Sequence, residues 1–572
     1  MRVVFVVTVV LFALVLGRVV WLQTVKAKGL QAAGKDQRTS ETLIKAVRGT
    51  IFSRDGDELA LSVPTTTVFA NPKLVTDPAG TVSVLGSMLQ LSAEKQVALL
   101  NAFTEKSKSF VYIARQLDED LAASVLALGL AGVDGYRESK RILPSGEVGR
   151  SVIGRTDIDG IGTAGIERQF DEELTGEDGE SVRQRDRDGN SIAGADVTAQ
   201  APVPGDDLQL TIDRSLQYQV EQALLARVAE LSAKGGVVVV MDSTTGEIYA
   251  MANVERTPEG QVEVTSANLA AVQPFEPGSV AKVFSIAAAV NEGAVTPDTT
   301  LEVPGKIVFD EGTDWEKTIT DATPHDVMPM TVRDILVDSS NIGTWKSAQK
   351  IGKERLGEYL GLFGFGSMTG LDFPDESKGR TKPASEWQGT EKVTVTYGYG
   401  YSATAVQLAA AVNTIANHGT YVAPKLLLGR INDTGTIVPT PPSSTHSVVS
   451  PETADAMTSM MTDVVCFGTG ERAQLPDISV AGKTGTAYKL QKNNTYEADD
   501  GARAYRASFV GFLPAADPRI TVLVSIDEPD PTTKDRFGGT AAAPLFTKVA
   551  EAAILELRIS PTPGDTGCPN AG

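Results

Sequence analysis

The chain has 572 residues, of which 42% are hydrophobic and 22% charged, and its formal net charge is -20. A chain of this size and composition can bury a large core and build roughly two to four domains, which excludes a disordered or fibrous protein. The acidic balance argues against a nucleic-acid partner, because phosphate binding requires clustered Lys and Arg side chains.

The first 25 residues carry the clear targeting signal. The stretch from Val3 to Leu22 is apolar except for Thr8 and Arg18, and about 20 such residues suffice for a helix to cross the hydrocarbon of a membrane. A cleaved signal peptide is the alternative, but no small-x-small cleavage site precedes the polar chain. We therefore expect an uncleaved single-pass anchor. Its very short leading segment favours the bulk of the chain on the outer side of the cell membrane.

Residues from about 26 to 205 are polar and rich in short turns, such as RDGDE at 54–58 and APVPGDD at 201–207. Turns at this density predict an elongated α+β region with small cores. Within it, GIGTAG at 160–165 matches a dinucleotide-binding pattern, but no buried strand precedes it and the following residues are acidic. A pyrophosphate site is therefore not expected there.

The chain becomes more regular after residue 206. The segment 215–231 has the apolar period of a helix that Asp213 or Ser215 can cap. The residues that follow predict two strands joined by a turn at 244–246, and 507–529 repeat this hairpin pattern before a closing amphipathic helix at 541–557. Strands from both ends of a helical interior predict an α+β domain with one antiparallel sheet flanked by helices.

A serine and a lysine stand at the start of the apolar segment FEPGSVAKVFSIAAAV, 275–290. Ser279 enters the first helical turn, and Lys282 at i+3 lies on the same face. A serine hydroxyl needs a base, and a lysine whose pKa is lowered by burial and by a nearby cation can serve as one. The helix N-terminus would favour a developing oxyanion. Taken alone, S-x-x-K is a weak signal.

Two further elements strengthen it. Ser339, Ser340 and Asn341 form S-x-N at the start of a helix-like stretch, and Lys483, Thr484 and Gly485 form K-T-G, followed by Thr486, in a strand-like stretch. The order S-x-x-K, S-x-N and K-T-G is the set found in penicillin-binding proteins and serine β-lactamases. The histidines at 325, 418 and 446 stand singly, which disfavours a Ser-His-Asp triad or a histidine metal site and indicates surface or capping roles.

Over nearly its whole length the chain resembles the class B penicillin-binding proteins, most closely the cell-division (septal) type. The likeness includes RGTIFSRDGDELALS at 48–62, GIERQFDEELTGEDG at 165–179 and the segment 398–426. It implies a membrane anchor at 1–25, a pedestal domain at 26–205, a transpeptidase domain at 206–558 and a tail at 559–572. One departure is Leu143, where the family has an aromatic residue before the proline of RILPSG; another is the short leading segment.

The resemblance also implies roles for the motif residues. Ser279 would attack a D-alanine carbonyl of a peptidoglycan stem peptide, and Lys282 would accept its proton. Ser339 would relay a proton to the leaving amine, and Asn341 would orient Lys282 and the substrate amide. Lys483 would keep Lys282 neutral and attract the substrate carboxylate.

Further roles concern the strand-like segment and the partners. Thr484 and Thr486 would bind the substrate carboxylate, Gly485 would let the substrate backbone approach, and the backbone N–H groups of Ser279 and Thr486 would form the oxyanion hole. The expected ligands are stem peptides and β-lactams, and the expected partners are a membrane glycosyltransferase and divisome proteins. No metal or organic cofactor is expected.

Two alternatives remain at this stage, and two others are disfavoured. An elongation-type class B transpeptidase shares the motifs, as does a non-catalytic β-lactam sensor or scaffold. A serine β-lactamase with S-x-N usually carries a Glu-x-x-x-Asn loop, which is not found after Asn341. A bifunctional synthase would need a glycosyltransferase domain, for which the first 205 residues are too few.

The two cysteines, Cys466 and Cys568, have neither zinc-site nor CxxC spacing. In an exported protein they are candidates for a disulfide that ties the tail back onto the transpeptidase domain. Two unpaired thiols, one packed and one in a free tail, are the alternative.

Overall fold

The structure is a computed structural model. It describes residues 1–572 except 28–38, 185–196, 310, 313–315, 433, 491–494, 498–502, 564 and 569–572. The fold is α+β, as predicted, and has two compact units. The first comprises residues 1–49, 62–140 and 172–206, and the second comprises 50–61, 141–171 and 207–572. This division differs from the expected one at residue 205, because two segments of the expected pedestal belong to the second unit.

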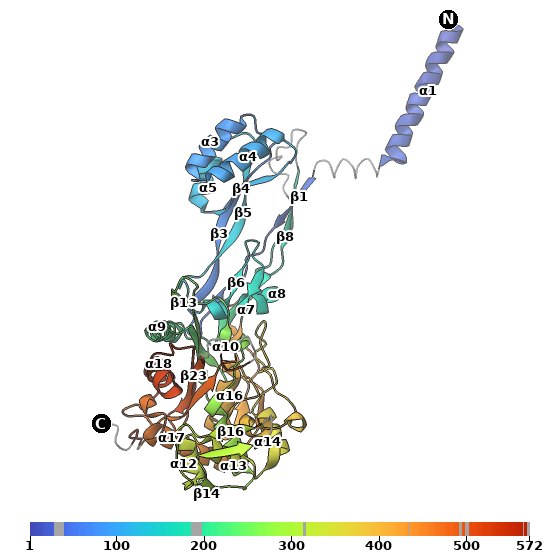
Figure 1. Ribbon diagram of the computed structural model, residues 1–572. Coiled ribbons are helices and arrows are strands. Elements are labelled where there is room, and N and C mark those ends of the chain that lie inside the picture. Colours follow the sequence, from blue (N-terminus) through green and yellow to red (C-terminus); the bar gives the residue numbers. More distant parts are fainter. Residues whose placement is uncertain are drawn as a thin grey trace. The chain divides into compact units, whose positions relative to one another are not determined.

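The first unit contains most of a small mixed domain. Its elements are α1 (Arg2–Thr24), β1 (Thr39–Ile44), β3 (Glu58–Ala70), α3 (Pro78–Met88), α4 (Ala93–Glu105), β4 (Val111–Leu117), α5 (Glu119–Leu126), β5 (Val133–Ile142), α8 (Asp171–Thr175), β8 (Gly179–Gln184) and β9 (Val197–Gln200). Figure 1 shows α3, α4 and α5 beside β4 and β5. Their core is small and includes Val68, Leu85, Leu99, Phe103 and Ile113.

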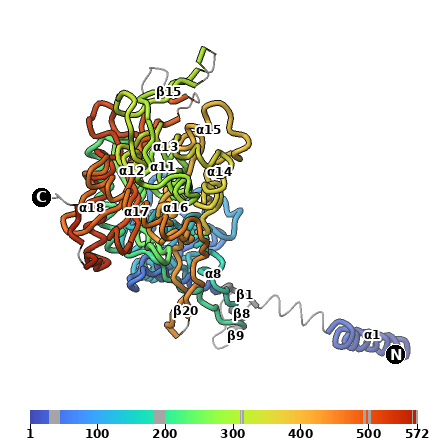
Figure 2. Tube along the Cα trace, turned by 90° about the horizontal axis from the view of Figure 1, so that it is seen from below, coloured from blue at the N-terminus to red at the C-terminus, as the bar shows by residue number. Residues whose placement is uncertain are grey.

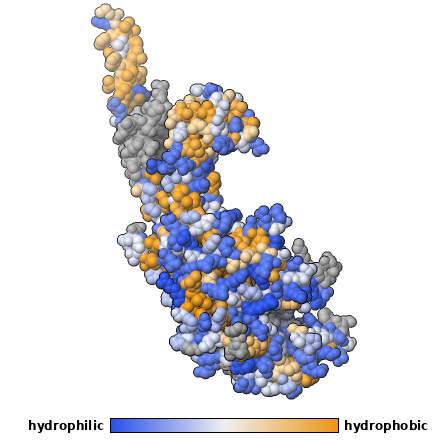
Figure 3. All heavy atoms as spheres, turned by 90° about the vertical axis from the view of Figure 1, so that its left-hand side faces the viewer, coloured by the Kyte–Doolittle hydropathy of each residue, from blue (hydrophilic) through white to orange (hydrophobic). Residues whose placement is uncertain are grey.

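α1 has 23 residues with a mean hydropathy of 2.8, which is long and apolar enough to cross a membrane by length and composition, as an anchor or a signal sequence would be. Figure 3 shows apolar side chains along this helix. Near its end, Arg18 and Lys26 lie over the ring of Trp21, with 4.5 and 5.0 Å to its centroid. Such residues suit a membrane interface, where an indole anchors and a cation reaches water.

The second unit holds the larger set of elements. Its helices are α6 (Arg150–Ile153), α7 (Gly165–Gln169), α9 (Arg214–Glu230), α10 (Leu269–Val272), α11 (Ala281–Asn291), α12 (Val332–Val337), α13 (Asn341–Ala348), α14 (Gly352–Leu362), α15 (Glu391–Thr394), α16 (Ala405–Ala416), α17 (Pro451–Phe467) and α18 (Ala543–Glu556), with short helices η1 (Gly278–Val280), η2 (Ala384–Glu386), η3 (Val395–Tyr397), η4 (Glu471–Ala473) and η5 (Gly538–Ala542). Its strands are β2 (Ile51–Phe52), β6 (Arg155–Thr156), β7 (Gly162–Ala164), β10 (Asp207–Leu210), β11 (Gly235–Asp242), β12 (Ile248–Arg256), β13 (Val262–Val264), β14 (Thr300–Val303), β15 (Lys306–Phe309), β16 (Lys317–Thr320), β17 (Met328–Thr331), β18 (Thr420–Val422), β19 (Leu427–Ile431), β20 (Ile437–Pro439), β21 (Thr445–Ser447), β22 (Ala481–Tyr488), β23 (Tyr505–Leu513) and β24 (Ile520–Asp527).

The second unit is organised around a six-stranded sheet in the order β13-β12-β11-β24-β23-β22, with antiparallel neighbours. As predicted, strands from distant parts of the chain lie side by side. β11 is buried on both faces: Val238 and Val240 pack with α9 and α18, whereas α16 packs on the other side. Asp213 caps α9 by accepting from the Leu216 N–H at 2.8 Å, which settles the choice between the two candidate caps.

A cluster of helices covers the sheet face that carries α16. Figure 2 shows α11, α12, α13, α16 and α17 grouped together, and α11 contacts α12, α13 and α17. α17 also packs on β22, the edge strand. This arrangement brings the start of α11, the start of α13 and β22 to one place.

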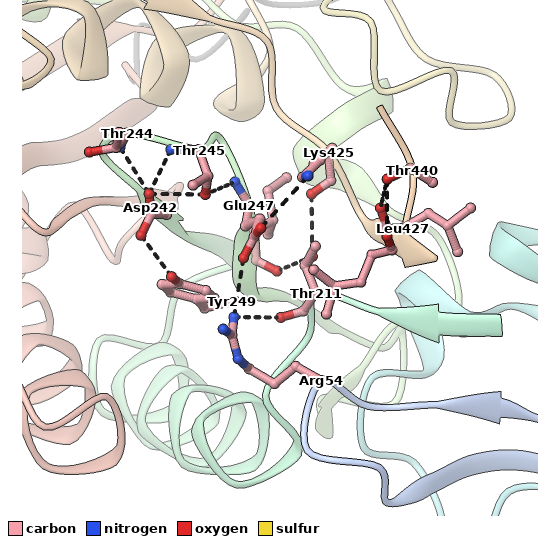
Figure 4. Close-up of polar contacts among 12 residues, drawn as sticks. Arg54, Thr211, Asp242, Thr244, Thr245, Glu247, Tyr249, Lys425, Leu427 and Thr440 are labelled. Carbon is pink, nitrogen blue, oxygen red and sulfur yellow. Dashed lines mark hydrogen bonds and ion pairs between the residues drawn. The ribbon is translucent and has the colours of Figure 1, made fainter. Parts of the chain in front are cut away.

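The segment 50–61 joins the second unit through charged and aromatic contacts (Figure 4). The guanidinium of Arg54 lies 4.4 Å from the ring centroid of Tyr249 and 3.5 Å from a carboxylate oxygen of Glu247. The Tyr249 hydroxyl donates to Asp242 at 2.7 Å, and the Lys425 ammonium lies 3.7 Å from Glu247. These contacts explain why part of the expected pedestal folds with the sheet.

The tail after α18 returns to the segment that leads into β22. Cys568 forms a disulfide with Cys466 of α17, with 5.3 Å between the two Cα atoms, so the structure adopts the paired alternative. Asp565 accepts hydrogen bonds from the N–H and the hydroxyl of Ser479, at 2.9 and 2.8 Å. Ser479 stands two residues before β22 begins.

Candidate active site

Ser279 lies where η1 leads directly into α11. Gly278, just before it, has a φ of 54°, a left-handed backbone that glycine adopts at no steric cost. The side chains of α11 are almost all buried, whereas Ser279 is partly exposed. The turn therefore presents the serine at the rim of an apolar helix, as the sequence predicts.

Lys282, one turn along, is only 1% exposed. Its amino group donates to the backbone oxygen and the hydroxyl of Ser339, at 2.5 and 3.0 Å. Burial lowers the pKa of Lys282 well below its usual value, the positive charge of Lys483 lowers it further, and Asp321 acts in the opposite direction. The surroundings thus favour a neutral amine, which has a lone pair to accept a proton.

Ser339 lies in the turn between α12 and α13. Its φ of 60° is left-handed, which is uncommon for a residue other than glycine and costs on the order of 1 to 3 kcal/mol. The next residue, Ser340, caps α13 by accepting from the Gly343 N–H at 2.8 Å. Because this cap fixes the start of α13 at Asn341, it also holds Ser339, which lies immediately before the cap residue.

Lys483 lies in β22 and is fully buried. Its ammonium donates to the hydroxyl of Ser339 at 3.0 Å and to the backbone oxygen of Thr484 at 3.2 Å. Burial lowers the pKa of Lys483 to about 7. The strand lysine therefore changes its charge near neutral pH.

The hydroxyl of Ser339 is the meeting point of these segments. It lies 3.0 Å from the Nζ atoms of both Lys282 and Lys483, which are 57 and 144 residues away in the chain. A hydroxyl between two amines can receive a proton from one group and release its own to another. The structure thus brings together three of the predicted site residues at hydrogen-bond distance.

Close backbone packing joins η1 to β22. A Cβ atom at Gly278 would lie 2.8 Å from the backbone oxygen of Thr486, and one at Gly485 would lie 2.9 Å from a methyl group of Val280 and 3.0 Å from the Pro277 oxygen. The family resemblance implies that Gly485 lets the substrate backbone approach. The structure gives it another reason, because a side chain there would push the turn that carries Ser279 away from the strand.

The threonines of β22 have protein partners of their own. The hydroxyl of Thr484 lies 2.7 Å from that of Thr469, and the Thr486 hydroxyl accepts from the Gly538 N–H at 3.0 Å. β22 pairs with β23 on one side only, because it is the edge of the sheet. Its other edge can therefore pair with an extended peptide.

Asn341 differs from its expected arrangement. Its side-chain amide donates to the backbone oxygen of Thr320 at 2.8 Å, whereas the Lys282 amine donates to Ser339. Thr320 ends β16, the second strand of a hairpin. The Asn341 side chain is thus fixed by this hairpin, and its expected contact with Lys282 is not among the hydrogen bonds of the described residues.

Asp321 and His325 are site neighbours that the sequence analysis missed. The Asp321 carboxylate accepts from Ser340 and from the start of α13. His325, expected to be a surface or capping residue, lies 3.1 Å from Asp321. Only an acid and a histidine four residues apart mark this segment in the sequence, and nothing in that spacing links them to Ser340.

Among the described residues, no group of three or more His, Cys, Asp and Glu side chains is placed to hold a metal ion. The functional groups of the site are hydroxyls, amines and backbone amides. Their arrangement suits acyl transfer through a nucleophilic hydroxyl.

Residues 236–551 match the family described as penicillin binding protein transpeptidase domain, and residues 43–210 match the penicillin-binding protein dimerisation domain. The chain belongs to the class B penicillin-binding proteins. It is thus a serine-type peptidoglycan D,D-transpeptidase by family.

Similar proteins support this assignment along the whole chain. Penicillin-binding protein PbpB of Mycolicibacterium smegmatis is 33% identical over 95% of this chain and 88% of its own length. Peptidoglycan D,D-transpeptidase FtsI of Escherichia coli is 31% identical over 98% of this chain and 92% of its own.

Solved structures agree with the fold. A peptidoglycan synthetase from Bifidobacterium adolescentis has a TM-score of 0.72 at 25% identity and covers 92% of this chain and 98% of that one. Penicillin binding protein 3 of Mycobacterium tuberculosis, solved with aztreonam, has a TM-score of 0.69 at 27% identity and covers 91% of this chain and 98% of that one.

Proposed function

We propose that this protein cross-links peptidoglycan stem peptides during septal cell-wall synthesis, through an acyl-enzyme on Ser279. The observation that carries the proposal is the meeting of Lys282 and Lys483 at the hydroxyl of Ser339, beside the turn that presents Ser279. Two buried amines are unfavourable for folding, so their presence is best explained by catalysis.

In the first half-reaction, the Ser279 oxygen attacks the carbonyl of the penultimate D-alanine and its proton passes to the neutral amine of Lys282. The backbone N–H groups of Ser279 and Thr486 stabilise the oxyanion. The C–N bond to the last D-alanine then breaks, and the leaving amine takes a proton relayed from Lys282 through Ser339. The products are free D-alanine and an acyl-enzyme.

In the second half-reaction, an amine of a neighbouring stem peptide attacks the acyl-enzyme. The proton lost by that amine returns to the Ser279 oxygen through Lys282, and the new amide is the cross-link. Lys483, Thr484 and Thr486 hold the donor's terminal carboxylate before it leaves, and β22 pairs with the donor backbone.

The septal role rests on the relatives. FtsI of Escherichia coli and PbpB of Mycolicibacterium smegmatis both align over most of their lengths with this chain. We propose a membrane glycosyltransferase and divisome proteins as partners, and β-lactams as inhibitors. A bond between Cys466 and Cys568 supports placing the catalytic unit outside the cytoplasm, because disulfides persist in oxidising compartments.

The chemistry is tested by labelling with fluorescent penicillin. Ser279→Ala should abolish covalent labelling and leave thermal unfolding unchanged, because one rim hydroxyl contributes little to packing. Labelling of this variant at the wild-type rate would place the nucleophile elsewhere.

The cellular role is tested by locating the labelled protein in growing cells. A septal transpeptidase gives label at division sites and filamentous cells on depletion. Label along the side walls would instead assign the elongation role.

A further inference from the structure

Asp321 follows β16 directly and lies almost buried, 8% exposed, beside the S-x-N segment. One carboxylate oxygen accepts from the hydroxyl of Ser340 at 2.6 Å. The other accepts from the backbone N–H groups of Asn341 and Ile342, at 2.6 and 3.1 Å. One side chain thus binds the three residues that follow Ser339.

These contacts complete the N-terminus of α13. The first N–H groups of a helix lack partners within it. Asp321 takes those of Asn341 and Ile342, and Ser340 takes that of Gly343. A carboxylate at this end is also favoured by the helix dipole. Asp321, which is not part of α13, therefore stabilises the start of this helix. The start of α13 in turn holds Ser339 in its left-handed conformation.

Thr320, the residue before Asp321, fixes the side chain of Asn341. The backbone oxygen of Thr320 accepts from the Asn341 amide at 2.8 Å. Thr320 and Asp321 together fix both the backbone and the side chain of Asn341, although they lie about 20 residues earlier in the chain.

His325 supports the carboxylate from the solvent side. Its Nε2 lies 3.1 Å from Asp321, and its Nδ1 lies 2.6 Å from the backbone oxygen of Asp326. Both neighbours are acceptors, so both ring nitrogens must carry a proton to satisfy them. The contact with Asp321 accordingly raises the pKa of His325. The contact therefore favours the protonated form of the imidazole.

The charge of Asp321 also reaches the base. It raises the pKa of Lys282, against the lowering by burial and by Lys483. The other titratable groups that face Asp321 are His325, Asp338 at the end of α12 and Tyr397 of η3. Lys483 lowers the pKa of Lys282 and Asp321 raises it, so Asp321 opposes the effect of the strand lysine on Lys282.

We propose that Asp321 is a positioning residue for the transpeptidase reaction: it holds Ser339 and Asn341 in place through the start of α13, and it supplies a negative charge to the surroundings of Lys282. The proposal rests on the proposed function in one respect, namely that Lys282 is the base. It adds a fourth segment, residues 320–325, to the three motifs.

Two substitutions separate the two roles. Asp321→Ala removes the hydrogen bonds and the charge together. Asp321→Asn keeps one oxygen that can accept from the start of α13, removes the charge, and replaces the oxygen that faces Ser340 and His325 with an NH2 group. Asp334→Asn is the matched control, because the Asp334 carboxylate likewise accepts from a backbone N–H and a hydroxyl at a helix start, those of Thr331, the N-cap of α12.

The measurement is the second-order rate of acylation by benzylpenicillin, on the full-length protein in detergent, from pH 5 to pH 9. We expect Asp321→Ala to lower the rate at its optimum about 100-fold, the loss associated with misplacement of catalytic groups. Asp334→Asn should acylate at the wild-type rate. Thermal unfolding shows whether each variant is folded.

The pH dependence of the acylation rate tests the electrostatic role of Asp321. Acylation rises with pH as Lys282 loses its proton, and removal of a nearby negative charge weakens the hold of Lys282 on that proton. Asp321→Asn should therefore move the rising limb to lower pH, by about 1 unit. A merely structural loss would lower the whole profile and leave its midpoint in place.

Acylation of folded Asp321→Ala within about twofold of wild type at every pH would overturn the positioning role. An unmoved midpoint in Asp321→Asn would overturn the electrostatic role, and this variant also decides the matter if the alanine variant does not fold. Lys282→Ala, measured in parallel, keeps the two hypotheses apart. Normal acylation of Lys282→Ala would refute the proposed function itself, whereas a strong defect there with wild-type behaviour of both Asp321 variants would refute only this inference.

Discussion

The two buried lysines of the site lie in different kinds of element, one in an apolar helix and the other in the edge strand of a sheet. Lys282 belongs to a helix whose neighbours are nearly all apolar, and the charges that act on it come from Lys483 and Asp321. Lys483 belongs to an edge strand, and burial alone lowers its pKa to about 7. Burial lowers the pKa of both lysines, but the pKa of the helix lysine also depends on charges from two other segments. The first suits a base, and the second suits a recognition charge.

The largest effect on acylation is expected when the helix lysine is replaced. Lys282→Ala should slow acylation by benzylpenicillin by about 10³- to 10⁴-fold, because the serine is left without a base. The measurement is the pseudo-first-order rate of acyl-enzyme formation against drug concentration, with thermal unfolding as the control for folding. A variant that acylates normally would show that the two lysines do not differ in the way described.

The corresponding change in the strand should be smaller. Lys483→Met should lower the acylation rate about 100-fold, through loss of one positive donor near the substrate carboxylate. Because the charge of Lys483 also lowers the pKa of Lys282, the rising limb of the pH profile should move to higher pH. This shift is opposite to that expected for Asp321→Asn. A shift to lower pH would contradict the electrostatic coupling of the two regions.

Lys483→Met should also make the protein more stable. Folding lowers the pKa of Lys483 from 10.5 to about 7. Between pH 7 and pH 10.5 the unfolded state therefore binds more protons than the folded state. The free energy of unfolding should consequently rise with pH across this window. In the variant this dependence should flatten, and stability at pH 7 should increase by about 1 to 3 kcal/mol. Denaturant unfolding at pH 7 and pH 9 measures both. Equal pH dependence in the two proteins would contradict the lowered pKa.

The smallest effect on catalysis is expected at the tail. Replacing both Cys466 and Cys568 by Ser removes a closure of about 100 residues, worth at most roughly 4 to 5 kcal/mol in the loop-entropy model. Asp565 still binds Ser479, so we expect a loss nearer 2 kcal/mol and acylation within about twofold of wild type.

Mass spectrometry of the exported protein, alkylated without reductant, checks the bond itself. Two alkylated thiols would contradict it. A large loss of acylation in the double variant would mean that the tail positions β22 for catalysis.

Much of this architecture could be predicted from the sequence. The strands β11, β12, β23 and β24 and the closing helix follow from apolar runs and turns, which are local patterns. The three motifs predicted Ser279, Lys282, Ser339 and Lys483 as site residues, because each motif is a short run of neighbouring residues. These are the parts whose signal is contained within a few residues.

Other parts depend on tertiary contacts and could not be predicted in this way. Asp321, with His325 beside it, contacts the start of α13 from a segment about 20 residues earlier in the chain. No pattern in the sequence predicts that contact. The membership of residues 50–61 in the second unit depends on Arg54 meeting Tyr249 and Glu247. The packing that requires Gly485 comes from η1, about 200 residues away in the chain.

The glycines packed around the turn that carries Ser279 constrain which substitutions such an enzyme can accept. A Cβ atom at Gly398 would lie 2.1 Å from the backbone oxygen of Gly278, and a Cβ atom at Gly278 or Gly485 would come within 2.8 or 2.9 Å of its nearest neighbour. A side chain added at any of these positions would displace the turn that carries Ser279. Mutations that lower drug acylation and preserve cross-linking should therefore accumulate in the surrounding side chains, while the three glycines stay unchanged.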